Sequence, residues 1–242
     1  MSTRRIDLAT NYLPREVQAI REAITAALRQ PDPQRPSQTI GPAKAGIYAF
    51  YDYDGEPIYV GQTAEGFSVR LGRHLTGQRS DAVAKYVLDP FEVHTVSMWS
   101  LPHIGDLPSK TRKTALDPYE YTVYQSLLEA SAFNAILNEG EILESELESL
   151  PEPLTCVIIP DGIFPDRSHP DIRIARRAQT ISLLAKNISE RKVSRGLRRA
   201  LLTQTERLNA LARARFEAMG GVVELEGAEG AVEEPEGLFP TP

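Results

Sequence analysis

The spacing of apolar residues predicts a chain that mixes helices with short strands. In residues 14–29 apolar side chains recur every three or four positions, which is typical of an amphipathic helix. Residues 46–61 are rich in aromatic and β-branched side chains and predict two short strands around a turn. Residues 66–79 read as a helix, and the alternation across 91–99 predicts a third strand.

The second half of the chain is predicted to be mostly helical. Asp117 followed by Pro118 has the character of a helix start, and the helix should reach about Ser131. Residues 156–160 are apolar enough for a further strand. Two amphipathic helices follow, near 171–187 and near 190–218.

These elements predict an α/β (α+β) fold with a small three-stranded, mainly antiparallel sheet flanked by helices. An N-terminal helix precedes the sheet and a helical extension follows it. The expected divisions are an N-terminal helix and linker in 1–40, a central domain in 41–165, a basic helical extension in 166–219 and an acidic tail in 220–242. The tail is rich in Gly, Pro and Glu and is expected to be disordered.

The first two strands can be placed in register from their turn. If Asp54-Gly55 is a two-residue turn, Tyr48 faces Gly61 and Phe50 faces Tyr59. Alternation then separates two faces, one with Ile47, Ala49, Tyr51, Ile58 and Val60, and the other with Tyr48, Phe50, Tyr59 and Gly61. Gly61 leaves space opposite Tyr48, although aromatic residues favour strands in any case.

Composition fits a globular intracellular protein. Hydrophobic residues make up 41 % of the 242 residues, enough for a sizeable core. The single cysteine, Cys156, allows no disulfide and no multi-cysteine zinc site, which suits a reducing compartment. No long apolar run and no signal-like N-terminus occurs, so a cytoplasmic protein without a membrane segment is expected.

Charge is distributed unevenly along the chain. The formal net charge is −6, yet residues 166–217 hold 13 basic and 5 acidic residues. Residues 41–165 and the tail are acidic. Such a basic block favours a polyanionic partner, although a solvated helix face gives similar counts.

Six residues in order resemble the motifs of the GIY-YIG endonucleases. The first motif stands as Gly46-Ile47-Tyr48 and the second as Tyr59-Val60-Gly61, with valine for the middle isoleucine. The remaining matches are Arg70 and His74 in RLGRH, a helical Glu120, and Asn134 after that helix. The resemblance covers about residues 45–135 and leaves both flanks unmatched.

The resemblance implies hydrolysis of DNA phosphodiesters with one divalent metal, Mg²⁺, for which Mn²⁺ would substitute. Tyr59 is then the expected base, although Tyr48 remains an alternative. Arg70 would meet the charge on the phosphate, and His74 would polarise a tyrosine or relay its proton. Asn134 is expected to support the site by hydrogen bonds.

Glu120 has two compatible interpretations. The resemblance makes it the metal ligand, and an inward-facing carboxylate needs a cation or a donor. Asp117 with Glu120 three positions later also forms a capping box. Some family members carry a lysine shortly after the second motif, where this chain has Gln62 and Thr63.

Two basic regions are candidates for contact with DNA. The first belongs to the C-terminal block, where the alternative is a helix that packs or mediates a homodimer. The candidates are Arg173, Arg176, Arg177, Arg191, Lys192, Arg195, Arg198 and Arg199 in that block, and Arg73, Lys110, Arg112 and Lys113 nearer the motifs. Such contacts would bind phosphates without reading sequence.

Three roles follow from the resemblance. The segments AGIYA and PIYVG, together with an N-terminal helix, are similar to the sequences of restriction enzymes of the family. A restriction or defence nuclease is therefore the first expected role. A repair or recombination nuclease acting on branched or damaged DNA is second. A nucleic-acid-binding protein with an inactive site is third, and the intact set of motif residues counts against it.

Overall fold

The computed structural model describes residues 13–75, 89–138, 140 and 142–222. In chain order its elements are α1 (Arg15–Leu28), β1 (Pro31–Asp32), β2 (Arg35–Thr39), β3 (Gly46–Tyr51), β4 (Pro57–Thr63), α2 (Phe67–Leu75), the short 3₁₀ helix η2 (Pro90–Glu92), β5 (Thr95–Ser100), α3 (Pro102–Gly105), α4 (Ser109–Ala130), β6 (Leu154–Val157), α5 (Phe164–Ser168), α6 (Pro170–Glu190) and α7 (Arg195–Ala218). The fold is mixed α/β, and both of its sheets are antiparallel.

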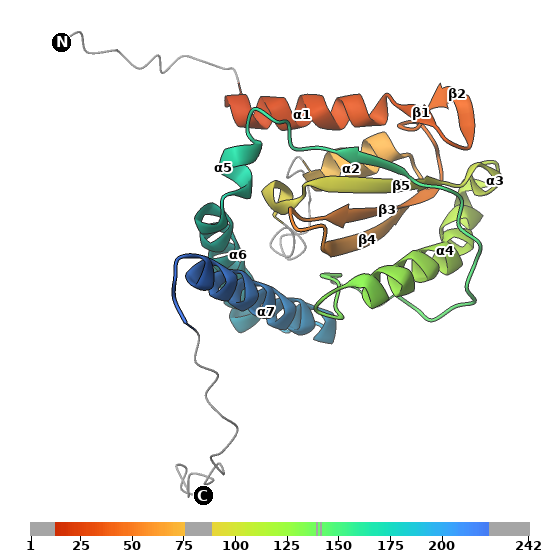
Figure 1. Ribbon diagram of the computed structural model, residues 1–242. Helices are drawn as coiled ribbons and strands as arrows, with labels where there is room; N and C mark the ends of the chain where they lie inside the picture. Colours follow the sequence, from red (N-terminus) through yellow and green to blue (C-terminus); the bar gives the residue numbers. More distant parts are fainter. Residues whose placement is uncertain (1–12, 76–88, 139, 141, 223–242) are drawn as a thin grey trace, which may run out of the picture.

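The central sheet has four strands in the order β4-β3-β5-β6, so the prediction of three strands was wrong. The fourth strand forms because β6 pairs with β5 close to residues 156–160, where a further strand was considered. The linker after α1 also differs from its prediction, since β1 and β2 form a small hairpin there. Figure 1 shows α1 and α2 on one side of the sheet and α4 on the other.

Each face of the sheet has its own apolar core. The core under α4 contains Ile47, Ala49 and Val60, while the core under α1 and α2 contains Tyr48, Phe50 and Tyr59. The predicted division of the hairpin into two faces is therefore confirmed, except that Ile58 joins the second core. Helices α6 and α7 close the second core at one end with Leu184, Leu197 and Ala200.

The register of β3 against β4 is confirmed where it matters for the site. Tyr48 pairs with Gly61 and Phe50 with Tyr59. The pairing shifts after Phe50 because the turn has three residues rather than two: Gly55 N–H donates to Asp52 C=O, and Gly55 has φ +76°. A turn followed by a left-handed residue adds one residue to the loop, and glycine takes that conformation without a steric cost.

Helix α4 begins eight residues before the predicted start. Asp117 lies inside the helix and cannot cap it, so the capping-box interpretation of Asp117 and Glu120 was wrong. Leu116 is fully buried in the core under α4, and this packing keeps the first turns helical in spite of Pro118. Lys110, Arg112 and Lys113, predicted to contact DNA, therefore lie in the first turns of this helix.

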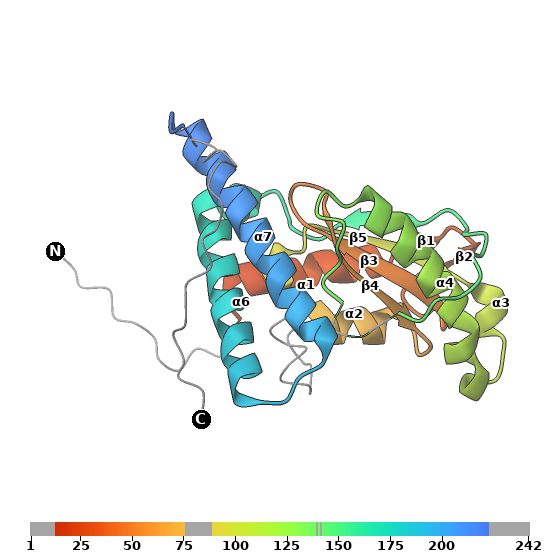
Figure 2. The same cartoon turned by 90° about the horizontal axis from the view of Figure 1, so that it is seen from below.

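Helices α6 and α7 form an antiparallel pair joined by residues 191–194, seen from below in Figure 2. Their arginines reach back to the hairpin turn. Asp52, whose side chain is 2 % exposed, accepts hydrogen bonds from Arg173, Arg177 and Arg207. Glu92 lies beside them and accepts a hydrogen bond from Arg177. The C-terminal helices are thus attached to the sheet through a buried ion network.

This network corrects the expectation that Arg173, Arg176 and Arg177 contact DNA. All three guanidinium groups are committed to carboxylates of the sheet domain. The pairs are Arg173–Asp54, Arg176–Asp89 and Arg177–Asp52. Arg173 and Arg177 are buried, and because a buried arginine requires a partner, these two side chains serve the fold; Arg176 is partly exposed and is paired with Asp89.

No helix in the described ranges has the length and apolar character needed to cross a membrane. The predicted acidic tail, residues 220–242, lies outside the described residues from 223 onward.

Candidate active site

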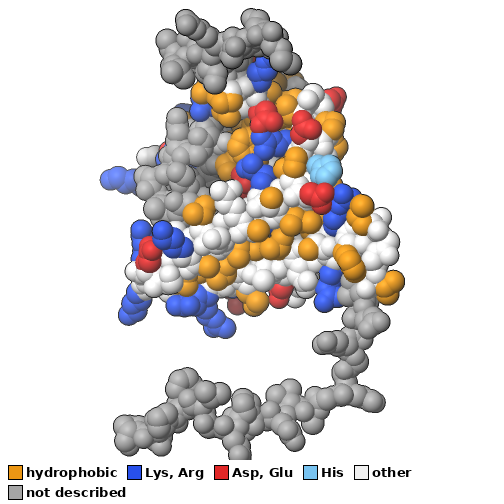
Figure 3. Space-filling model, turned by 90° about the vertical axis from the view of Figure 1, so that its left-hand side faces the viewer, with side chains coloured by type: hydrophobic (Ala, Val, Ile, Leu, Met, Phe, Trp, Pro, Cys, Tyr) orange, Lys and Arg blue, Asp and Glu red, His pale blue; other side chains and the backbone are white. Residues whose placement is uncertain are grey.

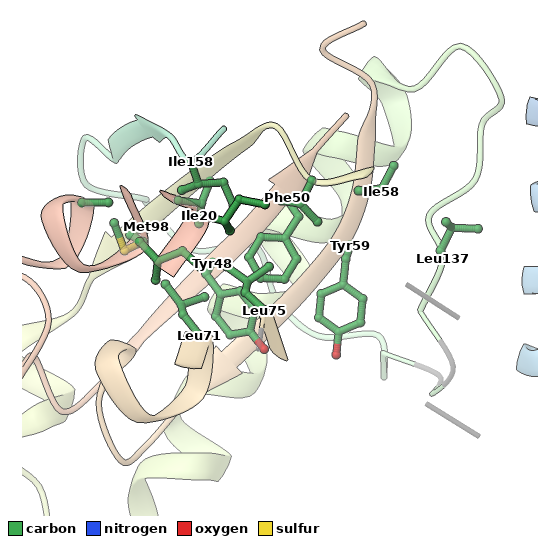
Figure 4. Close-up of a cluster of buried hydrophobic side chains, with 14 of the residues drawn as sticks. Ile20, Tyr48, Phe50, Ile58, Tyr59, Leu71, Leu75, Met98, Leu137 and Ile158 are labelled. Atoms are coloured by element: carbon green, nitrogen blue, oxygen red, sulfur yellow. The ribbon is translucent and has the colours of Figure 1, made fainter. Parts of the chain in front are cut away.

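The two motif tyrosines lie side by side on one face of the β3–β4 hairpin. Their ring centroids are 6.2 Å apart with an interplanar angle of 26°, and both side chains are buried. Figure 4 shows the two hydroxyl oxygens pointing in the same direction, with Leu71 and Leu75 of α2 on one side and Leu137 on the other. The space beside Gly61 that the sequence suggested is filled by the Tyr48 ring itself.

We expect Gly61→Ala to disrupt the site by steric crowding. A Cβ at Gly61 would lie 2.5 Å from Tyr48 Oη and 3.0 Å from Tyr59 Cε1, so both rings would have to move within a packed core. Overpacking of this kind costs about 1–3 kcal/mol of the free energy of unfolding. Urea denaturation measures this loss. Gly72→Ala is the control, because a Cβ there meets nothing within 4 Å and alanine favours a helix; an equal or smaller loss at Gly61 would contradict the packing described.

Arg70 connects helix α2 to the tyrosines. Its Nε donates a hydrogen bond of 3.1 Å to Tyr48 Oη. Burial acts to lower the pKa of the Arg70 guanidinium, but Tyr48 reverses this by charge interaction and hydrogen bonding, and the pKa is raised above its ordinary value. Tyr59 and Glu120 act in the same direction. Arg70 therefore contacts Tyr48 directly, and Tyr48 in turn stacks beside Tyr59.

Glu120 points from α4 toward the outer strand, β4. Its Oε2 accepts a hydrogen bond of 2.8 Å from Gln62 Nε2, which also donates to Asp117 Oδ1 at 2.7 Å. Burial raises the pKa of the Glu120 carboxyl, the Gln62 hydrogen bond opposes this, and Asp117 raises the pKa further. A half-buried carboxyl with an acidic neighbour holds a negative charge at a cost, which a cation would remove.

These groups fit a magnesium ion. Gln62 Oε1 is buried and has no hydrogen-bond partner among the described residues, so an uncompensated oxygen adjoins the two carboxylates. In the described part of the chain, no group of three or more His, Cys, Asp or Glu side chains is placed to hold a metal. Mg²⁺ prefers oxygen ligands and usually keeps several waters, so it takes only one or two carboxylates. Glu120 and Asp117 supply that number.

The asparagine that supports the hairpin is Asn138, not the predicted Asn134. Asn138 is buried, accepts from Val60 N–H at 3.2 Å and donates to Val60 C=O at 2.8 Å. It thereby satisfies the open edge of β4, the outermost strand. Asn134 is exposed and has φ 47°, a left-handed conformation that asparagine tolerates in turns.

The remaining predicted residues are placed less completely. His74 belongs to α2, but its side chain lies outside the described part of the structure. Arg73 forms an ion pair with Glu65, and Arg112 donates to the Leu107 and Ala64 carbonyl oxygens, so both have local partners. The other predicted DNA-contacting side chains are exposed: Lys110, Lys113, Arg191, Lys192, Arg195, Arg198 and Arg199.

Three residues of the site were not found from the sequence. Asp117 was assigned to a helix cap, and Gln62 was noted only as a departure from the motif. Both have a detectable signal, because Asp117 lies three residues before Glu120 on one helical face and Gln62 lies two strand positions after Val60, toward α4. Asn138 follows the apolar pair Ile136-Leu137, which marks a buried segment.

Comparisons with models of protein families, with curated protein sequences and with solved structures found no match to this chain.

Proposed function

We propose that the protein is a Mg²⁺-dependent endonuclease of the GIY-YIG type that hydrolyses DNA phosphodiester bonds. The observation that carries this proposal is that Arg70 hydrogen-bonds Tyr48, whose ring lies beside Tyr59, in the part of the hairpin that contains Gly61. Arg70 hydrogen-bonds Tyr48 and interacts with Tyr59 and Glu120. A phenol, a guanidinium and a carboxylate within one small region are the groups that such a hydrolysis requires.

Tyr59 is the base in this proposal. The Tyr48 hydroxyl already accepts a hydrogen bond from Arg70 and is fully buried, whereas Tyr59 retains 5 % exposure. Tyr59, acting as the phenolate, would take a proton from a water, the water oxygen would bond to phosphorus, and the bond from phosphorus to the 3′ oxygen would break, with the 3′ oxygen taking a proton from solvent water. The products are a 3′-hydroxyl and a 5′-phosphate. Tyr48 would orient Arg70, and His74 would relay the proton onward.

Arg70 and Glu120 have separate electrostatic tasks. Arg70 would stabilise the extra negative charge on the phosphate, since its guanidinium stays protonated at any working pH. Glu120, with Asp117 beside it, would hold Mg²⁺, which supplies Lewis-acid stabilisation of the phosphate oxygens and the leaving group. Gln62 would orient the two carboxylates.

The test is cleavage of DNA with and without Mg²⁺. We expect Tyr59→Phe to reduce the cleavage rate by about 10²–10⁴-fold, the usual worth of a general base. Tyr53→Phe is a matched control on the same hairpin, because its hydroxyl donates to the Phe91 carbonyl oxygen, away from the site. Equal rates for Tyr59→Phe and wild type would eliminate Tyr59 as the base.

The choice of substrate separates the expected roles. Supercoiled plasmid cut into discrete fragments supports a restriction nuclease, whereas preference for branched or damaged duplexes supports repair or recombination. If wild-type protein binds DNA but cuts neither substrate with Mg²⁺ or Mn²⁺, the nuclease proposal fails and a binding role replaces it.

A further inference from the structure

Most basic residues of the C-terminal helices fall into two groups, apart from Lys186 and Arg213, which also have no ion pair with a described residue. The first group consists of arginines that each form an ion pair with a carboxylate: Arg167, Arg173, Arg176, Arg177, Arg207 and Arg215. The second group is clustered within residues 191–199 and has no ion pair with any described residue: Arg191, Lys192, Arg195, Arg198 and Arg199. We call this second group the α6–α7 basic patch.

The side chains of the patch are exposed, while neighbouring residues anchor the patch in the apolar core. All five of its side chains are exposed, and the only acidic residue in 190–199 is Glu190. Leu197 and Ala200 between them are buried in the core, and Val193 packs against that core. Figure 3 shows Lys and Arg side chains gathered at the lower left of the face on which α6 passes into α7. The positive charge is thus held in place by apolar contacts.

The patch and the candidate active site border the same apolar core. Leu197 and Ala200 belong to the apolar core that also contains Tyr48 and Tyr59. The N-terminal end of α7 and helix α2, which carries Arg70, overlap in the view from below in Figure 2, whereas Figure 1 shows the sheet between them.

We propose that the α6–α7 basic patch binds the phosphate backbone of the DNA flanking the bond to be cut. The identity of the ligand rests on the proposed nuclease function. Five cations without an ion-pair partner among the described residues match a row of phosphates, and such contacts add affinity without reading base sequence.

A homodimer joined through the same patch is disfavoured by charge. A two-fold interface places a surface against its own copy, so the five cations would face five like charges. Like charges placed together across an interface oppose association, whereas DNA brings the opposite charge. Dimerisation through the patch is therefore the outcome that the test must separate from DNA binding.

The test is DNA binding measured by fluorescence anisotropy with a 30-base-pair duplex in EDTA, where Mg²⁺-dependent cleavage does not proceed. We expect the triple variant Arg195→Gln/Arg198→Gln/Arg199→Gln to bind at least about 10-fold more weakly than wild type. The slope of log K against log salt concentration should become shallower by about 0.9 for each lost phosphate contact. Circular dichroism and thermal unfolding confirm that the variant is folded.

The matched control is Arg15→Gln/Arg21→Gln/Arg29→Gln on α1. It removes the same charge from exposed positions on the opposite side of the molecule in Figure 1. We expect its affinity and salt slope to stay close to wild type. An equal effect of both triple variants, or none from the patch variant, would overturn the proposal, as would absence of DNA binding by wild type.

Two further readouts separate this proposal from its premise. If light scattering shows that the patch variant changes oligomeric mass while DNA affinity is unchanged, the patch is a subunit interface and the proposal is wrong. Patch-dependent binding without cleavage in Mg²⁺ supports the patch and rejects the nuclease. Mg²⁺-dependent cleavage by wild type, together with unaltered DNA binding by the patch variant, supports the nuclease and rejects the patch as a DNA-binding site.

Discussion

Asp52→Asn should lower the free energy of unfolding by about 3–5 kcal/mol, the usual cost of removing one partner from a buried ion pair. Asp52 Oδ2 is the acceptor shared by Arg173, Arg177 and Arg207, at 2.9 Å from Arg177. Asparagine has the same shape but removes the negative charge and turns an N–H₂ group toward three donors. The arginine side chains are only 2–5 % exposed, so water cannot replace the lost partner.

The prediction is measured by urea denaturation against a matched substitution. Asp106→Asn breaks the ion pair with Arg35, which is also close at 2.7 Å. Those two side chains are 68 % and 39 % exposed, and exposed pairs contribute about 0–1 kcal/mol. A loss at Asp52 no larger than at Asp106 would show that the network does not hold α6 and α7 to the hairpin turn.

Burial also shifts the pKa values of two other members of this network. It raises the pKa of the Glu92 carboxyl above its ordinary value, although Arg177 and Arg173 oppose the rise. It lowers the pKa of the Arg207 guanidinium, and Asp52 opposes that change. In both groups desolvation is the larger effect, so the pairing offsets a burial cost and is sensitive to the loss of any one partner.

Glu120→Gln should reduce Mg²⁺-dependent DNA cleavage by about 10²–10³-fold, the range found when one electrostatic stabiliser of a transition state is removed. Glutamine fills the same volume and can still accept from Gln62, so the fold should be preserved. It lacks the charge required to hold the ion. Calorimetric titration with Mn²⁺ provides a readout independent of activity, and the affinity should fall together with the cleavage rate.

Glu129→Gln is the control for this experiment, because Glu129 lies on the same helix with its side chain exposed. Its cleavage rate and metal affinity should match wild type. If Glu120→Gln binds metal and cuts DNA as well as Glu129→Gln does, the proposed metal site is wrong.

The raised pKa of Glu120 predicts a pH dependence. Only the ionised carboxylate binds the metal, so metal affinity should increase as pH rises through the raised pKa, and Glu120→Gln should lose this part of the pH dependence. Without metal the sign for stability is opposite. The folded state holds the proton more tightly than the unfolded state, so the stability from Glu120 is present at low pH and is lost over the same interval.

The hairpin was predictable because its information is local. Strand alternation and the Asp54-Gly55 turn determine which residues face one another, and the structure pairs Tyr48 with Gly61 as expected. The turn itself has one more residue than predicted. This difference arises from Asp52, whose Oδ1 accepts from the backbone N–H groups of Asp54 and Glu56. Side-chain hydrogen bonds of this kind are weakly visible in sequence.

The start of α4 and the choice between two asparagines depended on burial. A capping signal at Asp117 was plausible on local grounds, but Leu116 packs in the core and extends the helix upstream. The sequence alone gives little ground for choosing between Asn134 and Asn138. Only Asn138 meets the unpaired edge of β4, and this contact joins residues 78 positions apart.

By itself, the sequence determined the helices and strands in outline, the two faces of the hairpin, and the order of the motif residues. These follow from periodicity and turn chemistry, which act over a few residues. Tertiary structure alone decided that Arg70 contacts Tyr48, that Gln62 joins Asp117 to Glu120, and which cations of the basic block face solvent. The physical reason is that the role of a charged side chain depends on its ion-pair partner and on its burial. Both are determined by segments that are distant in the chain. A count of +8 could not separate buried, paired arginines from the exposed α6–α7 basic patch.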